Sequence, residues 1–282
     1  MTAFLGIDVG ATKVAAGMVD VGSGAVLRST SVPSNPARGG PSLLADCVAL
    51  AERVAGADQV EGVGIGVCEL VDPGGAVRSA DSFDWRGLDI AGSFREIAPI
   101  RVESDVRAAA RAEAIFGAGR TLRSFLYVNA GTGVSSALVL DGLPYIGARG
   151  NAVLLGAGPL DVEQVSGGTA VARAAGMSSA AEVNRAARAG DEAALAVLVR
   201  AGTALGEAIA FAVNLLDPEA VVLGGSVVLG AAPYRQALEP AIREHLWAEE
   251  TRGLSVLTCE LGDSAGLIGA ALAGAGGNGR GV

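Results

Sequence analysis

Two segments of this chain repeat one pattern at a fixed distance. The first, FLGIDVGATKVAAGMVD, begins at Phe4, the second, FLYVNAGTGVSSALVLD, begins at Phe125, and the two align without a gap at an offset of 121 residues. Each copy reads as an apolar strand, a turn with glycine and a second apolar strand. Such a repeat indicates two lobes built on one plan, the alternative being chance similarity between two apolar hairpins.

The rest of the chain alternates between helical and buried-strand patterns. Helical spacing covers residues 42–56, 106–119, 167–176 and 191–216, and strand patterns cover residues 60–72, 100–105, 220–228 and 254–261. A last helix over 262–276 would take Asp263 or Ser264 as its N-cap. The 282 residues are enough for two modest domains, and the alternation predicts an α/β fold.

Composition disfavours several classes of function. The net charge of −9, without any run of Lys and Arg, argues against binding to nucleic acid or to anionic membranes. The only histidine, His245, lies in an amphipathic helical stretch, so histidine triads and histidine-rich metal sites are not expected. The three cysteines are far apart and form no CxxC pair, which predicts neither structural zinc nor a disulfide framework.

Neither a secretory leader nor a membrane span is expected. The first strand pattern begins within the first few residues, with no signal peptide before it. We find no stretch of about 18 residues that is apolar throughout and free of charges and turn signals. The sequence therefore predicts a cytoplasmic protein whose partner is a small molecule, with no membrane and no nucleic acid.

Three turns carry residues suited to a nucleotide. The first hairpin turn holds Asp8, Gly10, Thr12 and Lys13. The matching turn of the second hairpin holds Gly131, Thr132 and Gly133, and a third turn after a buried strand holds Gly224, Gly225 and Ser226. Glycine lets a backbone approach a ligand closely. Threonine and lysine donate to phosphate oxygens, and an ionised aspartate suits Mg²⁺, directly or through water.

The position of these turns predicts phosphate binding. Ligands of α/β sheets tend to lie beyond the carboxyl ends of strands. The P-loop pattern GxxxxGK[ST] does not occur, and no dinucleotide fingerprint GxGxxG stands between a strand and a helix. For the first turn taken alone, an ordinary hairpin turn with a charge pair is the alternative.

A carboxylate stands where a strand pattern meets a helix. Asp105 lies in VESDVRAAARAE, at the junction of the two. The positive end of a helix favours the ionised form of a carboxylate, which can then accept the proton of an attacking hydroxyl in phosphoryl transfer. The alternative is that Asp105 only caps the helix.

These motifs, in this order, resemble those of the ROK family of sugar kinases, on the actin-like, hexokinase-like ATPase fold. GIDVGATK resembles the family's first phosphate motif, ESD its Glu-Asn-Asp motif, NAGTGVSSALVLDGLPYIGARGNA its second phosphate hairpin, LLDPEAVVLGGSV its adenosine-site region and LGDSAGLIGAA its closing helix. The resemblance covers most of the chain. It implies that Asp105 is the catalytic base and that ATP, with Mg²⁺, gives its γ-phosphoryl group to a hydroxyl, usually the primary hydroxyl of a hexose.

The resemblance also implies an architecture. Two α/β lobes of RNase-H-like topology would enclose a cleft, the first spanning about residues 1–106 with the last helix, 264–282, packed back on it, and the second spanning 107–263. The first two turns would hold the phosphates, Asp8 would also hold the metal, and the third turn would lie near the nucleoside. The resemblance further implies a homodimer.

The chain departs from the family on the sugar side. Ser104 replaces the Asn before the catalytic Asp, and the family's Gly-x-Pro-Gly loop ends here in Glu69. Leu154 and Ala157 replace the Glu and His of its Gly-Glu-x-Gly-His motif, and its cysteine-rich zinc motif is absent. We expect six residues to shape the acceptor pocket: Glu69, Ser104, Asn151, Leu154, Ala157 and Glu163, with Asp161 as the alternative to Glu163.

These departures predict an unusual acceptor. A hydroxyl that faces Leu154 or Ala157 loses its polar partner, which costs about 1–3 kcal/mol, or roughly ten- to a hundredfold in discrimination. Glucose is therefore a poor candidate, and an amino or deoxy sugar or a C7 cyclitol fits better. The alternative is a degenerate, regulatory protein that binds nucleotide or sugar without efficient turnover. Direct repression is not expected, because no DNA-binding module precedes the first hairpin.

Overall fold

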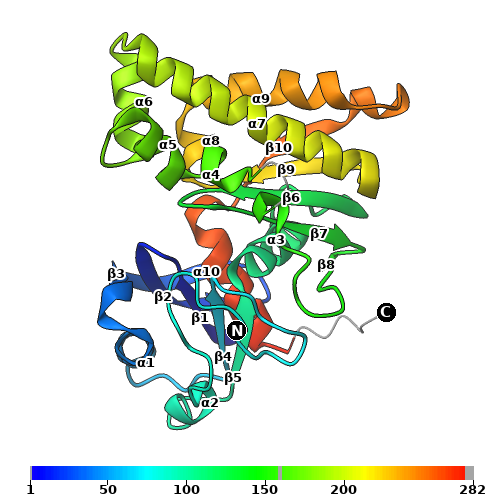
Figure 1. Ribbon diagram of the computed structural model, residues 1–282. Coiled ribbons are helices and arrows are strands. Elements are labelled where there is room, and N and C mark those ends of the chain that lie inside the picture. Colours follow the sequence, from blue (N-terminus) through cyan, green and yellow to red (C-terminus); the bar gives the residue numbers. More distant parts are fainter. Residues whose placement is uncertain (1, 158–160, 277–282) are drawn as a thin grey trace. The chain divides into compact units, whose positions relative to one another are not determined.

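The two copies of the repeat fold into the same kind of strand pair, as predicted. The computed structural model describes residues 2–157 and 161–276 (Figure 1). In it, β1 (Ala3–Val9) runs antiparallel to β2 (Lys13–Asp20), and β6 (Ser124–Ala130) runs antiparallel to β7 (Val134–Leu140). On its other side each first strand has a parallel neighbour, β4 (Val63–Val67) for β1 and β9 (Ala220–Gly224) for β6.

The chain forms two compact units, which differ from the expected lobes at their boundary. Unit 1 consists of residues 1–120, 142–152 and 261–282, and unit 2 of residues 121–141 and 153–260. The expected division after residue 106 would cut α3 (Asp105–Phe116) behind its second residue, but the helix belongs to unit 1, where it packs against α10 (Ala265–Gly274). The part of the expected last helix beyond residue 276 lies outside the described residues.

Unit 1 is a sheet with helices on both faces. Its strand order is β3-β2-β1-β4-β5, where β3 is Ala25–Pro33 and β5 is Ile100–Ser104. The three strands β1, β4 and β5 are parallel. The helix α1 (Gly40–Ala55) packs on one face, whereas α3 and α10 pack on the other (Figure 1).

Alternate residues of β1 face these two layers. Leu5, Ile7 and Val9 belong to the core under α1. Gly6 faces α10 so closely that a Cβ added there would lie 2.0 Å from the Leu267 carbonyl oxygen, and a Cβ at Gly64 of β4 would lie 1.7 Å from that of Ala270. Only glycine allows a helix backbone to lie this close to the strands.

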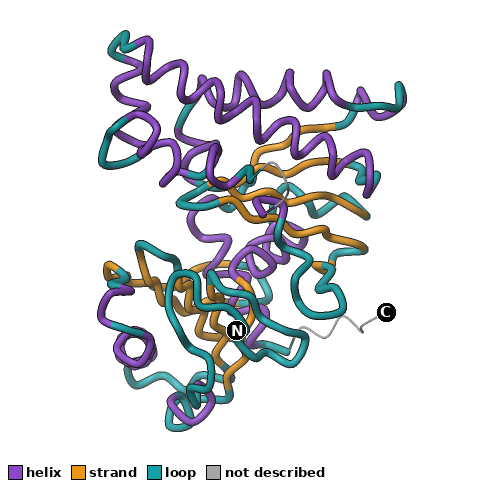
Figure 2. The backbone as a smooth tube through the Cα atoms, viewed as in Figure 1, coloured by secondary structure: helices purple, strands orange, loops and turns teal. Residues whose placement is uncertain are grey.

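A long irregular segment connects β4 to β5 (Figure 2). It contains a bridge between Val71 and Val77 and one short helix, α2 (Ile90–Ser93). Its middle is anchored in the core by Trp85, whose indole N–H donates to the Gly40 carbonyl at 3.0 Å and whose ring lies 4.9 Å from that of Phe83. The segment is therefore fixed near its centre despite having little regular structure.

Unit 2 packs a layer of helices on its own sheet. Its strands follow the order β10-β9-β6-β7, where β10 is Ser255–Thr258. The long helix α7 (Glu192–Leu216) runs beside α9 (Ala232–His245), and the two cover the strands (Figure 1). The smaller helices are α4 (Glu163–Ser166), α5 (Gly168–Ala175), α6 (Ala180–Arg188) and α8 (Ser226–Gly230). Leucine, valine and alanine side chains from strands and helices form one core.

The remaining elements are short. They are the strand β8 (Leu143–Pro144) and the 3₁₀ turns η1 (Pro36–Arg38), η2 (Leu155–Ala157), η3 (Glu250–Gly253) and η4 (Gly262–Ser264).

The glycine turn expected within residues 220–228 lies at the end of β9: the strand ends at Gly224, Gly225 turns the chain with φ = 96°, and residues 226–230 form α8. One local expectation was wrong. Neither Asp263 nor Ser264 caps α10 with its side chain. The 3₁₀ turn η4 runs directly into the helix, so Ser264 already has helical dihedral angles and not the extended ones that capping requires.

One described helix, α7, is long and apolar enough to cross a membrane by length and composition. More than half of its most apolar window, 56%, is buried within the protein. Leu198, Leu205 and Ile209 of this helix belong to the core of unit 2. This burial is typical of a core helix.

Candidate active site

The two carboxylates singled out in the sequence lie at the ends of parallel strands in unit 1. Asp8 of β1 pairs with Gly66 of β4, which pairs in turn with Glu103 of β5. Asp105 follows β5 directly and begins α3. A Cβ at Gly66 would lie 3.4 Å from the Cα of Asp105, so β4 passes close to this helix start. The sheet thus brings both acids to its carboxyl edge, as the motifs predicted.

Asp105 does not act as a helix cap in the usual way. The N-cap of α3 is Ser104, whose side chain makes no capping hydrogen bond. One Asp105 oxygen, Oδ1, accepts from the amide of the very next residue, Val106, at 2.6 Å, whereas a capping side chain accepts from an amide two or three residues further along the chain. The alternative of a purely capping Asp105 therefore has no support in the geometry.

The pKa of Asp105 is raised to about 7, mainly by burial. The nearby charge of Asp8 contributes to this rise, whereas the Val106 amide and the Arg107 guanidinium oppose it. Loss of water penalises the charged form of an acid, and a second negative charge does the same. Such a strongly perturbed carboxylate is typical of functional sites.

Asp8 is suited to holding a cation. Burial raises its pKa to about 6, Lys13 opposes this shift and Asp263 adds to it. In the described part of the chain, no hydrogen-bond donor contacts its carboxylate. Its oxygen Oδ2 lies against α10, where a Cβ added at Gly266 would be only 2.7 Å away. An unpartnered carboxylate beside other acids fits Mg²⁺, which prefers oxygen ligands.

The first turn leaves amides free for an anion. The Gly10 amide donates to the Lys13 carbonyl at 2.9 Å and closes the turn. Within the described residues, the amides of Ala11 and Thr12 make no hydrogen bond. Both Thr12 and Lys13 are exposed. Free amides beside a lysine are a suitable site for phosphate oxygens.

The second and third turns lie together in unit 2. The carbonyls of Gly131 and Thr132 accept from the amides of Gly168 and Thr169, at 2.8 and 3.1 Å. A Cβ at Gly225 would lie 2.4 Å from the backbone of Ala130, so the third turn touches the strand that leads into the second. The carbonyls of the second turn are thus occupied by the first residues of α5.

Glu163 stabilises this second turn. Its Oε2 accepts from the Val134 amide at 2.8 Å, and a Cβ at Gly133 would lie 2.5 Å from the same oxygen. The Glu163 carboxylate therefore stabilises the second turn from within the same unit. Glycine is needed at position 133 because a side chain there would collide with this carboxylate.

The other expected acceptor residues differ in exposure. Glu69 and Ser104 in unit 1 are buried, with 4% and 2% of their surface exposed. Asn151 of unit 1 and Leu154 and Ala157 of unit 2 are exposed, as is Asp161, the alternative to Glu163. A role in acceptor binding remains a prediction for each.

The motifs did not predict Arg107, whose side chain connects separate segments of unit 1 near Asp105. Its Nε donates to Glu103 at 2.6 Å, and its two terminal nitrogens donate to the carbonyls of Gly150 and Val71, both at 2.8 Å. The side chain is 1% exposed. The spacing of Glu103 and Arg107 suggests their pairing, but nothing local in the sequence predicts the two carbonyls.

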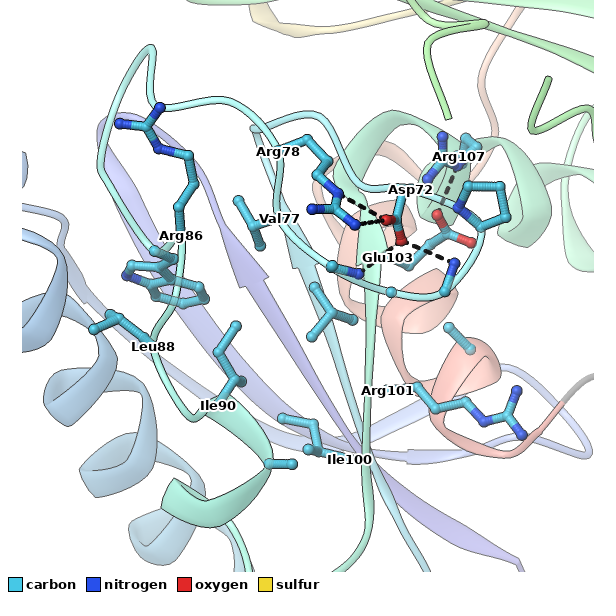
Figure 3. A pocket seen from close by; sticks show the side chains of 18 of the residues that line it. Asp72, Val77, Arg78, Arg86, Leu88, Ile90, Ile100, Arg101, Glu103 and Arg107 are labelled. Carbon is cyan, nitrogen blue, oxygen red and sulfur yellow. Dashed lines mark hydrogen bonds and ion pairs between the residues drawn. The ribbon is translucent and has the colours of Figure 1, made fainter. Parts of the chain in front are cut away.

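A cavity of about 1030 Å³ lies along β5 (Figure 3). Asp72 and Arg78 pair at its rim, and Val77, Ile90 and Ile100 give it an apolar side. None of the site residues predicted from the sequence lines it. This cavity is therefore separate from the carboxylates at the sheet edge.

Comparison with known proteins identifies the family. The sequence matches the profile of the ROK family over residues 4–274. The chain belongs to the ROK family. It is 26% identical over 307 residues to the glucokinase of Halalkalibacterium halodurans, covering 94% of this chain and 93% of that protein.

Solved structures of ROK proteins share its fold. The ROK family glucokinase from Streptomyces griseus, in complex with glucose and AMPPNP, matches with a TM-score of 0.85 and 27% identity over 98% of this chain and 100% of that one. The ROK hexokinase from Thermus thermophilus matches with a TM-score of 0.79 and 31% identity, over 97% and 98% of the two chains. The two-lobe actin- and hexokinase-like fold predicted from the motifs is confirmed.

Proposed function

We propose that this ROK protein is an ATP-dependent kinase that phosphorylates a hydroxyl of a sugar or a sugar-like polyol. The placement of Asp105 carries the proposal. Its carboxylate lies at the end of β5, beside Asp8, without capping α3, and its pKa is raised to about 7. The relatives described above are glucokinases and a hexokinase, which supports the same class of reaction.

Asp105 is the proposed general base. A base works best when its pKa lies near the operating pH, because it is then both ionised and able to take a proton. Asp105 accepts the proton of the acceptor hydroxyl while that oxygen attacks the γ-phosphorus and the bond to ADP breaks. Positioning and charge stabilisation supply most of the rate in such transfers.

The remaining roles follow from the turns. Asp8 would hold Mg²⁺, directly or through water, and the metal when bound neutralises phosphate charge. The free amides of Ala11 and Thr12 and the side chain of Lys13 would bind phosphate oxygens. In unit 2, Gly131–Gly133 would also bind phosphates, and Gly224–Ser226 would lie near the nucleoside.

The acceptor is proposed to be an amino or deoxy sugar or a C7 cyclitol, phosphorylated on a primary hydroxyl. Leu154 and Ala157 support this, because neither can pair with the hydroxyl that an ordinary hexose would present. A cytoplasmic location and a homodimer complete the proposal.

The test is ADP release with Mg·ATP over a panel of glucose, N-acetylhexosamines, 3-amino-3-deoxyglucose and C7 cyclitols. We expect turnover of an amino sugar or a cyclitol, and loss of turnover by roughly 10²–10⁴-fold in Asp105→Asn. Efficient turnover of glucose would contradict the assignment of the acceptor. Nucleotide binding without turnover of any acceptor would favour the regulatory alternative.

Asp191→Ala is the matched control. Asp191 is a genuine cap, whose Oδ1 accepts from the amides of Ala193 and Ala194 at 2.9 and 3.0 Å. Its loss should cost about 1 kcal/mol of stability and leave turnover unchanged. If Asp105→Asn behaved in the same way, Asp105 would be a cap and the catalytic role would be wrong.

A further inference from the structure

Glu69, which stands where the ROK pattern has glycine, turns its carboxylate onto the loop of residues 79–83. Oε1 accepts from the amides of Ser82 and Phe83, at 2.6 and 3.0 Å. Oε2 accepts from the Asp81 amide at 2.9 Å and from the Ser79 hydroxyl. Two carboxylate oxygens with four donors have little capacity left for a ligand.

The side chain of Glu69 is closed off from the acceptor. It is 4% exposed, and a buried carboxylate is stable only when it is well hydrogen-bonded. A direct contact with a sugar is therefore not the role that this geometry supports.

The loop that Glu69 holds belongs to the same edge of the sheet as Asp105. Val67, the last residue of β4, pairs with Ser104, and the Cys68 amide donates to the Val9 carbonyl at 3.2 Å. Cys68 and Glu69 thus follow β4 at the level where Asp105 follows β5. Ser82, within the loop, is the hydrogen-bond partner of the Cys68 thiol.

Only the middle of this loop depends on Glu69. Before it, Arg78 donates its amide to the Leu70 carbonyl at 2.7 Å, and the Leu70 amide donates to the Ser79 hydroxyl at 2.8 Å. After it, Phe83 and Trp85 are buried in the core, 4% and 1% exposed. Residues 80–82 span the gap between these anchors, and the Glu69 carboxylate fixes the amides of Asp81 and Ser82 there.

We infer that Glu69 is a positioning residue that fixes residues 80–82 beside Asp105 and so selects the acceptor without touching it. This inference rests on the proposed kinase activity. A glycine at this position offers no acceptor to these amides, so the loop of this chain is built differently from one that follows Gly-x-Pro-Gly. The sugar-side departures therefore include the shape of a loop as well as changed contact residues.

The test is Glu69→Gln. Glutamine is similar in shape, but its NH₂ group would face backbone N–H groups, so it cannot replace both oxygens. We expect the KM for the acceptor to rise about tenfold or more, with the KM for ATP changed less than twofold. Hydrogen exchange at residues 81–83 should become faster, because glutamine cannot accept from all three of those amides.

Glu113→Gln is the matched control. Glu113 is also buried, and its carboxylate accepts from the amides of Ala118 and Leu261, both at 2.8 Å. It lies eight residues along α3 from Asp105, about 12 Å at 1.5 Å per residue. This variant should lose stability, yet keep the acceptor KM and the exchange rates at residues 81–83.

The outcomes separate the inference from the proposed function. An unchanged acceptor KM in Glu69→Gln, in a protein whose wild type turns over, overturns the inference alone. So does an equal rise of both KM values, as a merely structural residue would give. A wild type without turnover overturns the proposed function, and hydrogen exchange at residues 81–83 then decides about Glu69. Unchanged protection in Glu69→Gln overturns the positioning role as well, and faster exchange supports it.

Discussion

At the scale of single residues, folding makes the ionised forms of Asp105 and Asp8 unfavourable. The pKa of Asp105 is raised to about 7 and that of Asp8 to about 6, mainly by burial. An acid whose pKa is higher in the folded than in the unfolded protein contributes stability at low pH, and this contribution is lost as the pH rises through the folded value. Near neutral pH, the ionised forms of Asp8 and Asp105 therefore persist although burial in the folded protein disfavours them.

The pH dependence of activity follows from Asp105. Because the base must be ionised, kcat/KM should fall as the pH drops below about 7, approaching tenfold per pH unit. Initial rates between pH 5.5 and 8.5, at saturating Mg·ATP, measure this. The melting temperature should show the opposite sign: Asp105→Asn should gain stability over wild type as the pH rises from about 4 to about 7, and keep that gain at higher pH. A rate that is flat from pH 8 to pH 5.5 would contradict Asp105 as the base.

At the scale of elements, α10 sets the position of Asp8. The helix lies on β1 and β4 with its backbone nearly touching Gly6 and Gly64, and its first turn brings Gly266 against the Asp8 carboxylate. Since close packing transmits small displacements, the helix start determines where this carboxylate can lie. A helix that looks purely structural thus takes part in the site.

Gly266→Ala tests this contact. The new Cβ would lie 2.7 Å from Asp8 Oδ2, so the carboxylate must move. We expect kcat to fall about tenfold, which corresponds to about 1.4 kcal/mol in the barrier, while the melting temperature holds or rises because alanine favours helix. The control is Gly230→Ala at the end of α8, where a Cβ meets nothing within 4 Å. A fully active Gly266→Ala would show that Asp8 tolerates displacement.

At the scale of the whole molecule, both units carry turns that we propose to bind phosphates, so nucleotide should stabilise the fold. A ligand at a hundred times its Kd adds about 2.7 kcal/mol, or roughly 5–10 °C in melting temperature for a chain of this size. Thermal melting with AMPPNP and Mg²⁺ measures it. EDTA should remove most of the shift, because Asp8 then repels the phosphates. An equal shift with and without Mg²⁺ would contradict a metal at Asp8.

The repeat and the motifs predicted a large part of this structure. Both hairpins follow from two apolar runs separated by a turn with glycine, and the position of Asp105 follows from a strand pattern running into a helix pattern. Contacts between distant segments could not be predicted in this way. Glu69 binds amides 12–14 residues further on in an irregular loop, and Arg107 binds carbonyls 36 and 43 residues away. No local pattern encodes such pairings.

The order of segments in unit 1 has a consequence for how the protein is made. Its closing helix, α10, comes after every residue of unit 2. On the ribosome, the unit that carries both acids must therefore wait without α10 on the glycine side of its sheet, although domains generally fold from the amino end first. Asp8 meets its neighbour Gly266 only after that residue has been synthesised, so a chain released earlier lacks the contact that positions this carboxylate.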